Sequence, residues 1–251
     1  MALIGSRLLV VLDGLTERTA SGCIHGVGWY VNRLASSVVE HADQSPEQAL
    51  ESAISRTAEL HRDTCDLSHP GTPAAAIGIV QFQENRIRYL VLGDVTIIVD
   101  VNDSEHVISD DRLGKVNTAL LREVNGLTND SPDKEVALVR MKHAELAVRN
   151  KVGGYWVAAS DPAVARQAMA GEFDLANIRR VAILTDGAAR VVDLFGVYEW
   201  RDVMTTLSTE GPHELIRQVR AIEQSDPVGK RWPRNKVSDD ATVIYCDTGQ
   251  T

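Results

Sequence analysis

The stretch Arg7-Leu-Leu-Val-Val-Leu-Asp13-Gly14 contains a sequence pattern that recurs later in the chain. Its short apolar run is partly β-branched and ends in Asp-Gly, which predicts a buried strand. The pattern returns as Arg180-Val-Ala-Ile-Leu-Thr185, which again ends in Asp-Gly at Asp186-Gly187. A third apolar strand, predicted at 241–246, follows Asp239-Asp240. Carboxylates therefore stand at one end of three predicted strands.

The rest of the chain mixes predicted strands and predicted helices. Connections between the strands at 74–81, 86–92 and 95–101 are so short that these strands should pair antiparallel. A further strand is expected at 155–159. Helices are predicted at 22–41, 45–65, 112–125, 133–150, 161–170, 188–195, 199–209 and 212–225. The order is not a strict alternation of strand and helix and no linker divides it, so we predict one α+β domain over residues 1–251.

Composition limits the partners of the chain. Its 251 residues carry 26 Lys and Arg against 35 Asp and Glu, a formal charge of −9. This charge disfavours nucleic acid and anionic membranes as main partners, because both would repel it. The three cysteines are too few and scattered for a disulfide framework. No export signal opens the sequence, and no apolar run reaches the ~18 residues of a membrane span. We therefore expect a reduced, cytoplasmic protein.

The acidic positions at the strand ends could hold metal ions. Rigid strands that end together bring carboxylates to one edge of a sheet, and Mg²⁺ and Mn²⁺ prefer oxygen ligands. A bridged pair of such ions can turn a bound water into a nucleophile. Each Asp-Gly taken alone is more commonly a turn. The argument for a metal site rests on the whole set.

Four short motifs occur in a fixed order along the chain: Val10-Val-Leu-Asp-Gly14, Leu90-Val-Leu-Gly-Asp94, Ala182-Ile-Leu-Thr-Asp-Gly187 and Asp239-Asp-Ala-Thr-Val243. Together they resemble the signature elements of the metal-dependent protein phosphatases of the 2C type, the PPM family, in a divergent bacterial branch. The resemblance spans about residues 8–246. It implies the family's four-layer αββα sandwich, in which two antiparallel sheets are flanked by helices.

The resemblance also implies roles for individual residues. Asp13 would bridge two Mn²⁺ or Mg²⁺ ions, and the backbone carbonyl of Gly14 would add an oxygen. Asp186 and Asp239 would hold the second ion, so Asp13, Asp186 and Asp239 are the expected catalytic set. Metal-activated water would hydrolyse phosphoserine or phosphothreonine in a phosphorylated protein substrate, without a covalent enzyme intermediate.

Two further acidic residues belong to the implied metal set. Asp94 could help Asp186 to hold a weaker third ion. Asp240 stands where the family often has Asn, so either Asp239 or Asp240 could be the ligand. Both are candidates at this stage.

The chain also departs from the family's pattern. Family members grip phosphate with an arginine on a strand upstream of the first metal aspartate, and only 12 residues precede Asp13. We therefore expect the usual N-terminal strand and its arginine to be missing. Leu15-Thr16-Glu17 replaces the usual glycine pair after Asp-Gly. Arg18, and Arg234 in the basic loop 229–236, are the predicted substitutes for binding phosphate. If they do not suffice, the alternative is a catalytically weak or inactive phosphatase-like binding or regulatory protein.

Other candidate sites are weaker. His61, Cys65 and His69 have spacings that a zinc site could use. They straddle a helix end and a Pro-Gly loop, so we interpret them as surface residues. Cys23 and His25 could in principle pair as nucleophile and base. Because they stand two residues apart before a helix, we interpret them as packing and capping residues.

Overall fold

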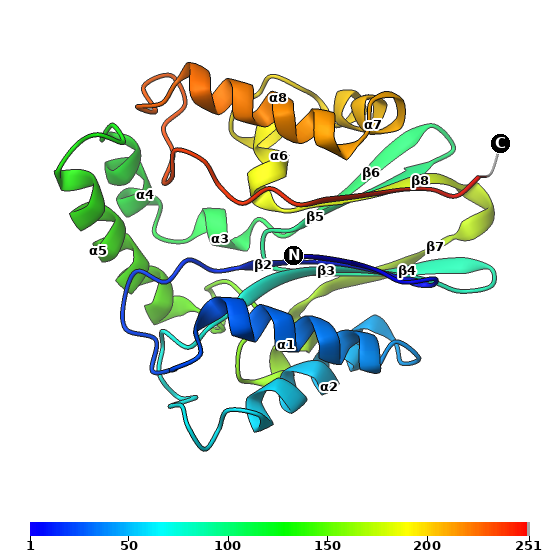
Figure 1. Cartoon of the computed structure of the whole chain (residues 1–251), viewed down its shortest axis with the longest axis horizontal. Helices are drawn as coiled ribbons and strands as arrows, with labels where there is room; N and C mark the ends of the chain where they lie inside the picture. The colour runs from blue at the N-terminus through cyan, green and yellow to red at the C-terminus, as the bar shows by residue number, and fades with distance from the viewer. Residues whose placement is uncertain (250–251) are drawn as a thin grey trace.

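The computed structural model describes residues 1–249, which form two antiparallel sheets packed face to face (Figure 1). The first sheet has the order β1-β2-β3-β4-β7, and the second has the order β6-β5-β8-β9. The strands of the first sheet are β1 (Ala2–Ile4), β2 (Leu8–Gly14), β3 (Ala75–Phe82), β4 (Arg86–Leu92) and β7 (Met169–Asp174). Those of the second sheet are β5 (Thr96–Val101), β6 (Ser104–Ser109), β8 (Ile178–Leu184) and β9 (Val243–Asp247).

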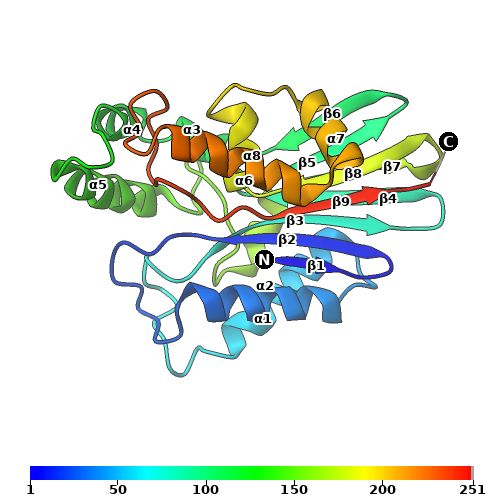
Figure 2. The same cartoon turned by 45° about the horizontal axis from the view of Figure 1, so that its top comes forward.

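Helices cover the outer faces of both sheets (Figures 1 and 2). Helices α1 (Gly26–Glu40) and α2 (Pro46–Glu59) lie on the first sheet. The second sheet is covered by α6 (Asp186–Asp193), α7 (Trp200–Thr209) and α8 (Pro212–Ser225). At one end of the sandwich lie α3 (Arg112–Lys115), α4 (Thr118–Asn125) and α5 (Asp133–Val148). The expected four-layer αββα sandwich is confirmed. Among residues 1–249, no helix is both long and apolar enough to cross a membrane.

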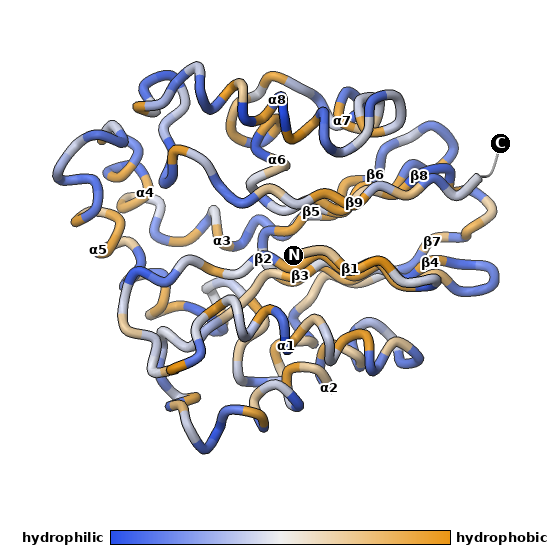
Figure 3. Tube along the Cα trace, in the orientation of Figure 1, coloured by the Kyte–Doolittle hydropathy of each residue, from blue (hydrophilic) through white to orange (hydrophobic). Residues whose placement is uncertain are grey.

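The central strands contain runs of consecutive apolar residues because both of their faces are buried there. On β2, Leu8, Val10 and Leu12 pack toward α1 and α2. The alternate residues Leu9 and Val11 pack into the core between the two sheets. Hydrophobic residues accordingly concentrate along the strands, and polar residues along the outer loops (Figure 3). A strand buried on both faces has no polar side to present, so its sequence shows a continuous apolar run.

The two Asp-Gly pairs end strands at points of very close packing. A Cβ atom on Gly14 would lie 2.3 Å from Cγ1 of Val27 on α1. A Cβ atom on Gly187 would lie 2.2 Å from the backbone carbonyl oxygen of Asp240. Gly14 is the last residue of β2, and Gly187 lies in the first turn of α6. Neither pair is only a turn. Because glycine has no side chain, each one leaves room for a neighbouring segment to pack against the end of a strand.

The sequence analysis missed three strands, and all of them are edge strands: β1, β6 and β7. An edge strand pairs on one side only and tolerates polar, exposed residues, so it lacks the apolar run of a central strand. The short β1 pairs with β2 in the region where we expected the family's N-terminal strand to be missing. Its residues, Ala-Leu-Ile, include no arginine.

Other element boundaries also differ from the prediction. Residues 155–159 form isolated bridges rather than a strand, and their apolar character comes from burial beside Ala74. The helix predicted at 161–170 is a short 3₁₀ helix, η1 (Pro162–Gln167), and β7 follows it directly. The helix predicted at 112–125 is split at Asn117, whose φ of 53° is incompatible with a continuous helix. Residues 15–25 and 60–74 lie outside helices and strands, so α1 starts later and α2 ends earlier than predicted.

The burial of one face of α1 allows a prediction about the free energy of unfolding. Leu34 is fully buried in the core that joins α1 to the first sheet. Leu34→Ala should lower the free energy of unfolding by about 2–5 kcal/mol, because it removes buried methylene groups and leaves a cavity. Val39 on the same helix is 48% exposed, so Val39→Ala should change it by less than about 0.5 kcal/mol. Urea denaturation of both variants measures the difference, and equal losses would contradict this packing.

Candidate active site

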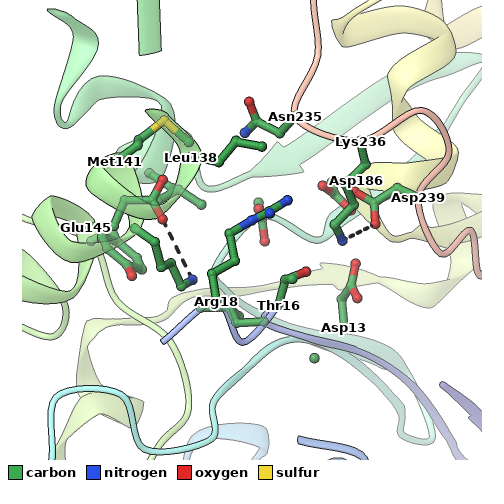
Figure 4. A pocket seen from close by; sticks show the side chains of 16 residues that line it. Asp13, Thr16, Arg18, Leu138, Met141, Glu145, Asp186, Asn235, Lys236 and Asp239 are labelled. Atoms are coloured by element: carbon green, nitrogen blue, oxygen red, sulfur yellow. Dashed lines mark hydrogen bonds and ion pairs between the residues drawn. The ribbon is translucent and has the colours of Figure 1, made fainter. Parts of the chain in front are cut away.

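Four aspartates from different segments line one cavity of about 170 Å³. Asp13 comes from the end of β2, and Asp94 from the turn between β4 and β5. Asp186 is the first residue of α6, directly after β8, and Asp239 precedes β9. Figure 4 shows Asp13, Asp186 and Asp239 grouped on one side of this cavity. The two sheets thus bring together residues that are up to 226 positions apart (239 − 13).

Burial and mutual repulsion raise the pKa values of Asp13, Asp94 and Asp186. Burial raises the pKa of Asp13 to about 9, together with the charge of Asp186 and a hydrogen bond between the two side chains. Burial, followed by the charge of Asp186, raises the pKa of Asp94 to about 7. The pKa of Asp186 is also raised, first by burial and then by the charge of Asp239. Charge in this cluster is incompletely compensated by the protein, and a set of clustered carboxylate oxygens is the donor set that hard divalent cations prefer.

Asp239, and not Asp240, faces the cavity. Lys236 Nζ lies 2.5 Å from Oδ1 of Asp239, and Arg190 Nη2 lies 3.1 Å from its Oδ2. The buried Arg190 also donates to Glu223 over 2.7 Å. Asp240 is exposed and is not among the residues that line the cavity in the described part of the chain. Of the two candidates that the sequence left open, Asp239 is the one that lines this cavity.

Three cationic side chains line the same cavity: Arg18, Lys142 and Lys236. Arg18 extends across its centre (Figure 4). Its Nη1 lies 2.7 Å from both carboxylate oxygens of Glu135 on α5. Lys142, also on α5, lies 3.7 Å from Glu145. The side chain of Arg18 is only 18% exposed, whereas that of its partner Glu135 is 65% exposed.

Arg234 does not have the predicted position. Its side chain is 3% exposed, and Nη1 pairs with Asp226 at 3.3 Å. Its other N–H groups donate to backbone carbonyls, including Val237 over 3.0 Å. Because its donors are used by the basic loop and by Glu223 and Asp226 at the end of α8, Arg234 holds the loop against this helix and cannot grip a substrate. Of the four basic residues in the loop, Lys236 is the one that lines the cavity.

The sequence analysis missed Lys142 and Glu145. They stand three residues apart on α5, a spacing that is common for ion pairs on exposed helix faces. Burial lowers the pKa of Lys142 and raises that of Glu145, which distinguishes them from an exposed pair. The sequence carries no signal that α5 packs its polar face against the strand ends. Leu15 and Thr16, which replace the expected glycine pair, also line the cavity.

Comparison with protein families identifies the class of this chain. The family model described as protein phosphatase 2C matches residues 3–221, which is well over half of the 251 residues. The chain therefore belongs to the protein phosphatase 2C family. A comparison with curated protein sequences found no match.

Solved structures share the fold at low sequence identity. The serine/threonine phosphatase PstP/Ppp of Mycobacterium tuberculosis is 15% identical, with a TM-score of 0.57 over 98% of this chain and 90% of that one. The PstP catalytic domain in complex with two manganese ions is 17% identical, with a TM-score of 0.54 and the same coverage. The phosphatase Stp1 of Staphylococcus aureus is 14% identical, with a TM-score of 0.53 over 96% and 83% of the two chains. These matches confirm the fold that the motifs implied.

The raised pKa values predict how stability depends on pH without metal. An unfolded aspartate titrates near 3.8 and folded Asp13 near 9. Between these values the folded state binds more protons than the unfolded state, so the free energy of unfolding falls as pH rises. Asp13→Asn removes this group and should make the protein about 1 kcal/mol or more stable than the parent near pH 8, with a smaller gain near pH 5.

Urea denaturation in EDTA at the two pH values tests this prediction. Asp43 is exposed in the turn after α1, so Asp43→Asn should follow the parent at both pH values. A parent protein whose stability rises from about pH 5 to about pH 8, with no difference from the Asp13 variant, would contradict the repulsion described above.

Proposed function

We propose that this chain is a metal-dependent protein phosphatase that hydrolyses phosphoserine and phosphothreonine in phosphorylated proteins. The observation that carries the proposal is the cavity in which four aspartates face three cationic side chains. Carboxylates without metal would repel a phosphate, and the cations alone would bind it without activating water. Only the two sets together account for hydrolysis of a phosphomonoester. Membership of the protein phosphatase 2C family supports the same reaction.

The carboxylate set fits Mn²⁺ or Mg²⁺. Asp13, at the centre of the mutual repulsion, would be the bridging ligand, and the carbonyl of Gly14 would add an oxygen. Asp186 and Asp239 would hold the second ion, and Asp94 a weaker third one. When bound, the ions supply an activated water and positive charge opposite the phosphoryl oxygens. The two manganese ions in the similar PstP catalytic domain support the first two of these ions.

The surrounding residues orient Asp239. Its two carboxylate oxygens accept hydrogen bonds from Lys236 and Arg190, and its backbone carbonyl accepts one from Arg220 over 2.5 Å. Glu223 joins Arg190 to Arg220 through its two oxygens. A ligand that is held from both sides stays in one orientation, which is what partners beyond the ligands provide in metal sites.

The cations of the cavity would bind the substrate. A phosphate dianion needs donors in addition to the metals, because charge-assisted hydrogen bonds fix its orientation. Arg18 lies over the cavity and forms an ion pair with Glu135. Lys142 and Lys236 line the same space. These side chains are our candidates to replace the family's upstream arginine, which β1 does not contain.

A second candidate function follows from the same feature. Arg18 already has a carboxylate partner in Glu135, so its charge is partly used before a phosphate arrives. A phosphatase-like binding or regulatory protein would bind metal and phosphopeptide without turnover. Measuring metal binding and hydrolysis on the same sample distinguishes the two functions.

The neighbouring aspartates at the end of the chain provide a matched test. Asp239→Asn should lower kcat/KM with Mn²⁺ by more than ~100-fold, because loss of a ligand should exceed the 10–100-fold effect of a partner beyond the ligands. Asp240→Asn should retain activity within about 3-fold, because its side chain lies outside the cavity. Hydrolysis of a phosphopeptide panel with Mn²⁺, and with EDTA as the metal-free control, gives the result. Equal activity of the two variants would contradict the assignment, and metal binding by the parent without hydrolysis would establish the binding function.

Arg18 can be tested as a substrate-binding residue. Arg18→Ala should raise KM for a phosphopeptide about 10-fold with a smaller change in kcat, as expected when uniform binding is lost. The effect should shrink as salt rises, because screening weakens the attraction in the parent. Arg179→Ala is the control, since Arg179 is exposed on β8 and pairs with Asp103. Steady-state kinetics at low and high salt measures both, and an unchanged KM at low salt would remove Arg18 from the site.

A further inference from the structure

A cluster of two cysteines and one histidine lies outside the active site. Cys23 precedes α1, and His61 and Cys65 follow α2. One potential ligand atom from each residue lies within 4.8 Å of the other two. Cys23 Sγ is 3.1 Å from Cys65 Sγ and 3.6 Å from His61 Nδ1. His69, which the sequence grouped with His61 and Cys65, instead accepts the backbone N–H of Gly71 at Nδ1.

These separations fit tetrahedral metal coordination. Bond lengths of about 2.3 Å to sulfur and about 2.0 Å to nitrogen place sulfur and nitrogen ligands about 3.5 Å apart, and two sulfurs about 3.8 Å apart. The sulfur–nitrogen pair of Cys23 and His61 already has the required separation. The sulfur pair of Cys23 and Cys65 needs to open by only about 0.7 Å. Side-chain rotation can supply this, because both cysteines are partly exposed.

His61 is the anchor of this cluster. We expected a surface residue, but its side chain is 2% exposed. Nδ1 faces Cys23, and Nε2 is buried without a hydrogen-bond partner among the described residues. The ring packs against Trp29 with centroids 5.1 Å apart. A metal on Nδ1 would place the proton on Nε2.

Backbone N–H groups lie near both sulfurs. The backbone N–H groups of His25 and Gly26 interact with the sulfur of Cys23, and those of Ile24 and His25 with that of Cys65. The segment between Cys23 and α1 thus places backbone N–H donors near both sulfurs. Positive ends of peptide dipoles near sulfur stabilise its negatively charged form, which is the form that binds metal. Burial nevertheless raises the pKa of the Cys23 thiol, whereas, despite burial, hydrogen bonds, the largest with Cys23, lower the pKa of the Cys65 thiol.

We propose that Cys23, His61 and Cys65 form a second metal site, which binds one Zn²⁺ with a water in the fourth position. Two thiolates and an imidazole are soft and borderline ligands, which favour zinc over the Mn²⁺ or Mg²⁺ that carboxylates prefer. The partial exposure of both cysteines leaves the fourth position accessible to water. The proposal does not depend on the phosphatase activity, because none of these residues lines the active-site cavity.

The site would connect two long irregular segments. Residues 15–25 carry Arg18 into the active-site cavity, and residues 60–74 follow α2. The segments run beside each other (Figures 1 and 2), and the backbone N–H of Asp66 donates to the carbonyl of Gly22 over 2.9 Å. A metal that binds only the folded chain stabilises it. Zinc would therefore stabilise the segment that positions Arg18.

Cobalt substitution in the full-length, reduced protein tests the proposal. Co²⁺ bound by thiolates gives a sulfur-to-cobalt charge-transfer band in the near ultraviolet, which carboxylate ligands do not give. We expect this band in the parent, its loss on addition of one equivalent of Zn²⁺, and at least ~10-fold weaker binding in Cys65→Ser. Cys246→Ser is the matched control, because Cys246 lies on β9 outside the cluster. Asp239→Asn should retain the band, which separates this site from the active site.

A second measurement guards against variants that simply unfold. Zinc should raise the Tm of the parent and of Cys246→Ser by more than that of Cys65→Ser, while circular dichroism shows all three folded without metal. A reduced parent without the thiolate band would overturn the proposal, and so would an unchanged band in Cys65→Ser. A Cys23–Cys65 disulfide with no zinc binding after reduction would overturn it in favour of a redox pair.

Discussion

Repulsion among the carboxylates of Asp13, Asp94, Asp186 and Asp239 is the constraint on which the rest of this structure depends. They face one cavity, and burial leaves them poorly solvated. Such a cluster is tolerated only where protons or cations compensate it. The strands beside these aspartates are rigid because both of their faces are buried in separate cores, and they keep the carboxylates together despite the repulsion. The αββα arrangement thus serves the site by holding like charges together.

The second sheet contributes a supporting layer of charge. Arg190 and Glu223 are both buried, and their ion pair connects α6 to α8. Removal of either partner would leave a buried charge unpaired, which typically costs several kcal/mol. The same network reaches Asp239 through Arg190. Helices on the outer face of the second sheet therefore influence the cavity through one chain of ion pairs.

Local sequence predicted the parts of the fold that are determined locally. The apolar runs of β2 and β8 marked the central strands, because burial of both faces removes every polar position. The aspartates at the ends of these runs were predicted as site residues because rigid strands that end together bring carboxylates to one edge of a sheet. Edge strands such as β7 carry no comparable signal, since one pairing partner and an exposed face permit most residue types.

Residues that depend on tertiary packing could not be predicted. Lys142 lines the cavity because α5 lies across the end of the sandwich. Arg234 does not line it, because its side chain is buried in an ion pair with Asp226. Cys23 lies 38 residues before His61 (61 − 23), so only the packing of two irregular segments brings them together. Spacing along the chain pointed to His69 instead. In each case the deciding contact joins elements that are distant in sequence.

The most direct test of the central claim is the number of protons released when metal binds. Calorimetric titration of the chelator-treated protein with Mn²⁺ at about pH 7, repeated in buffers with different ionisation enthalpies, measures this number. Because the pKa of Asp13 is raised to about 9 and that of Asp94 to about 7, binding should release about one proton or more. The release should fall by about one proton in Asp13→Asn. Binding of Mn²⁺ without proton release, or release that is unchanged in the variant, would contradict the account.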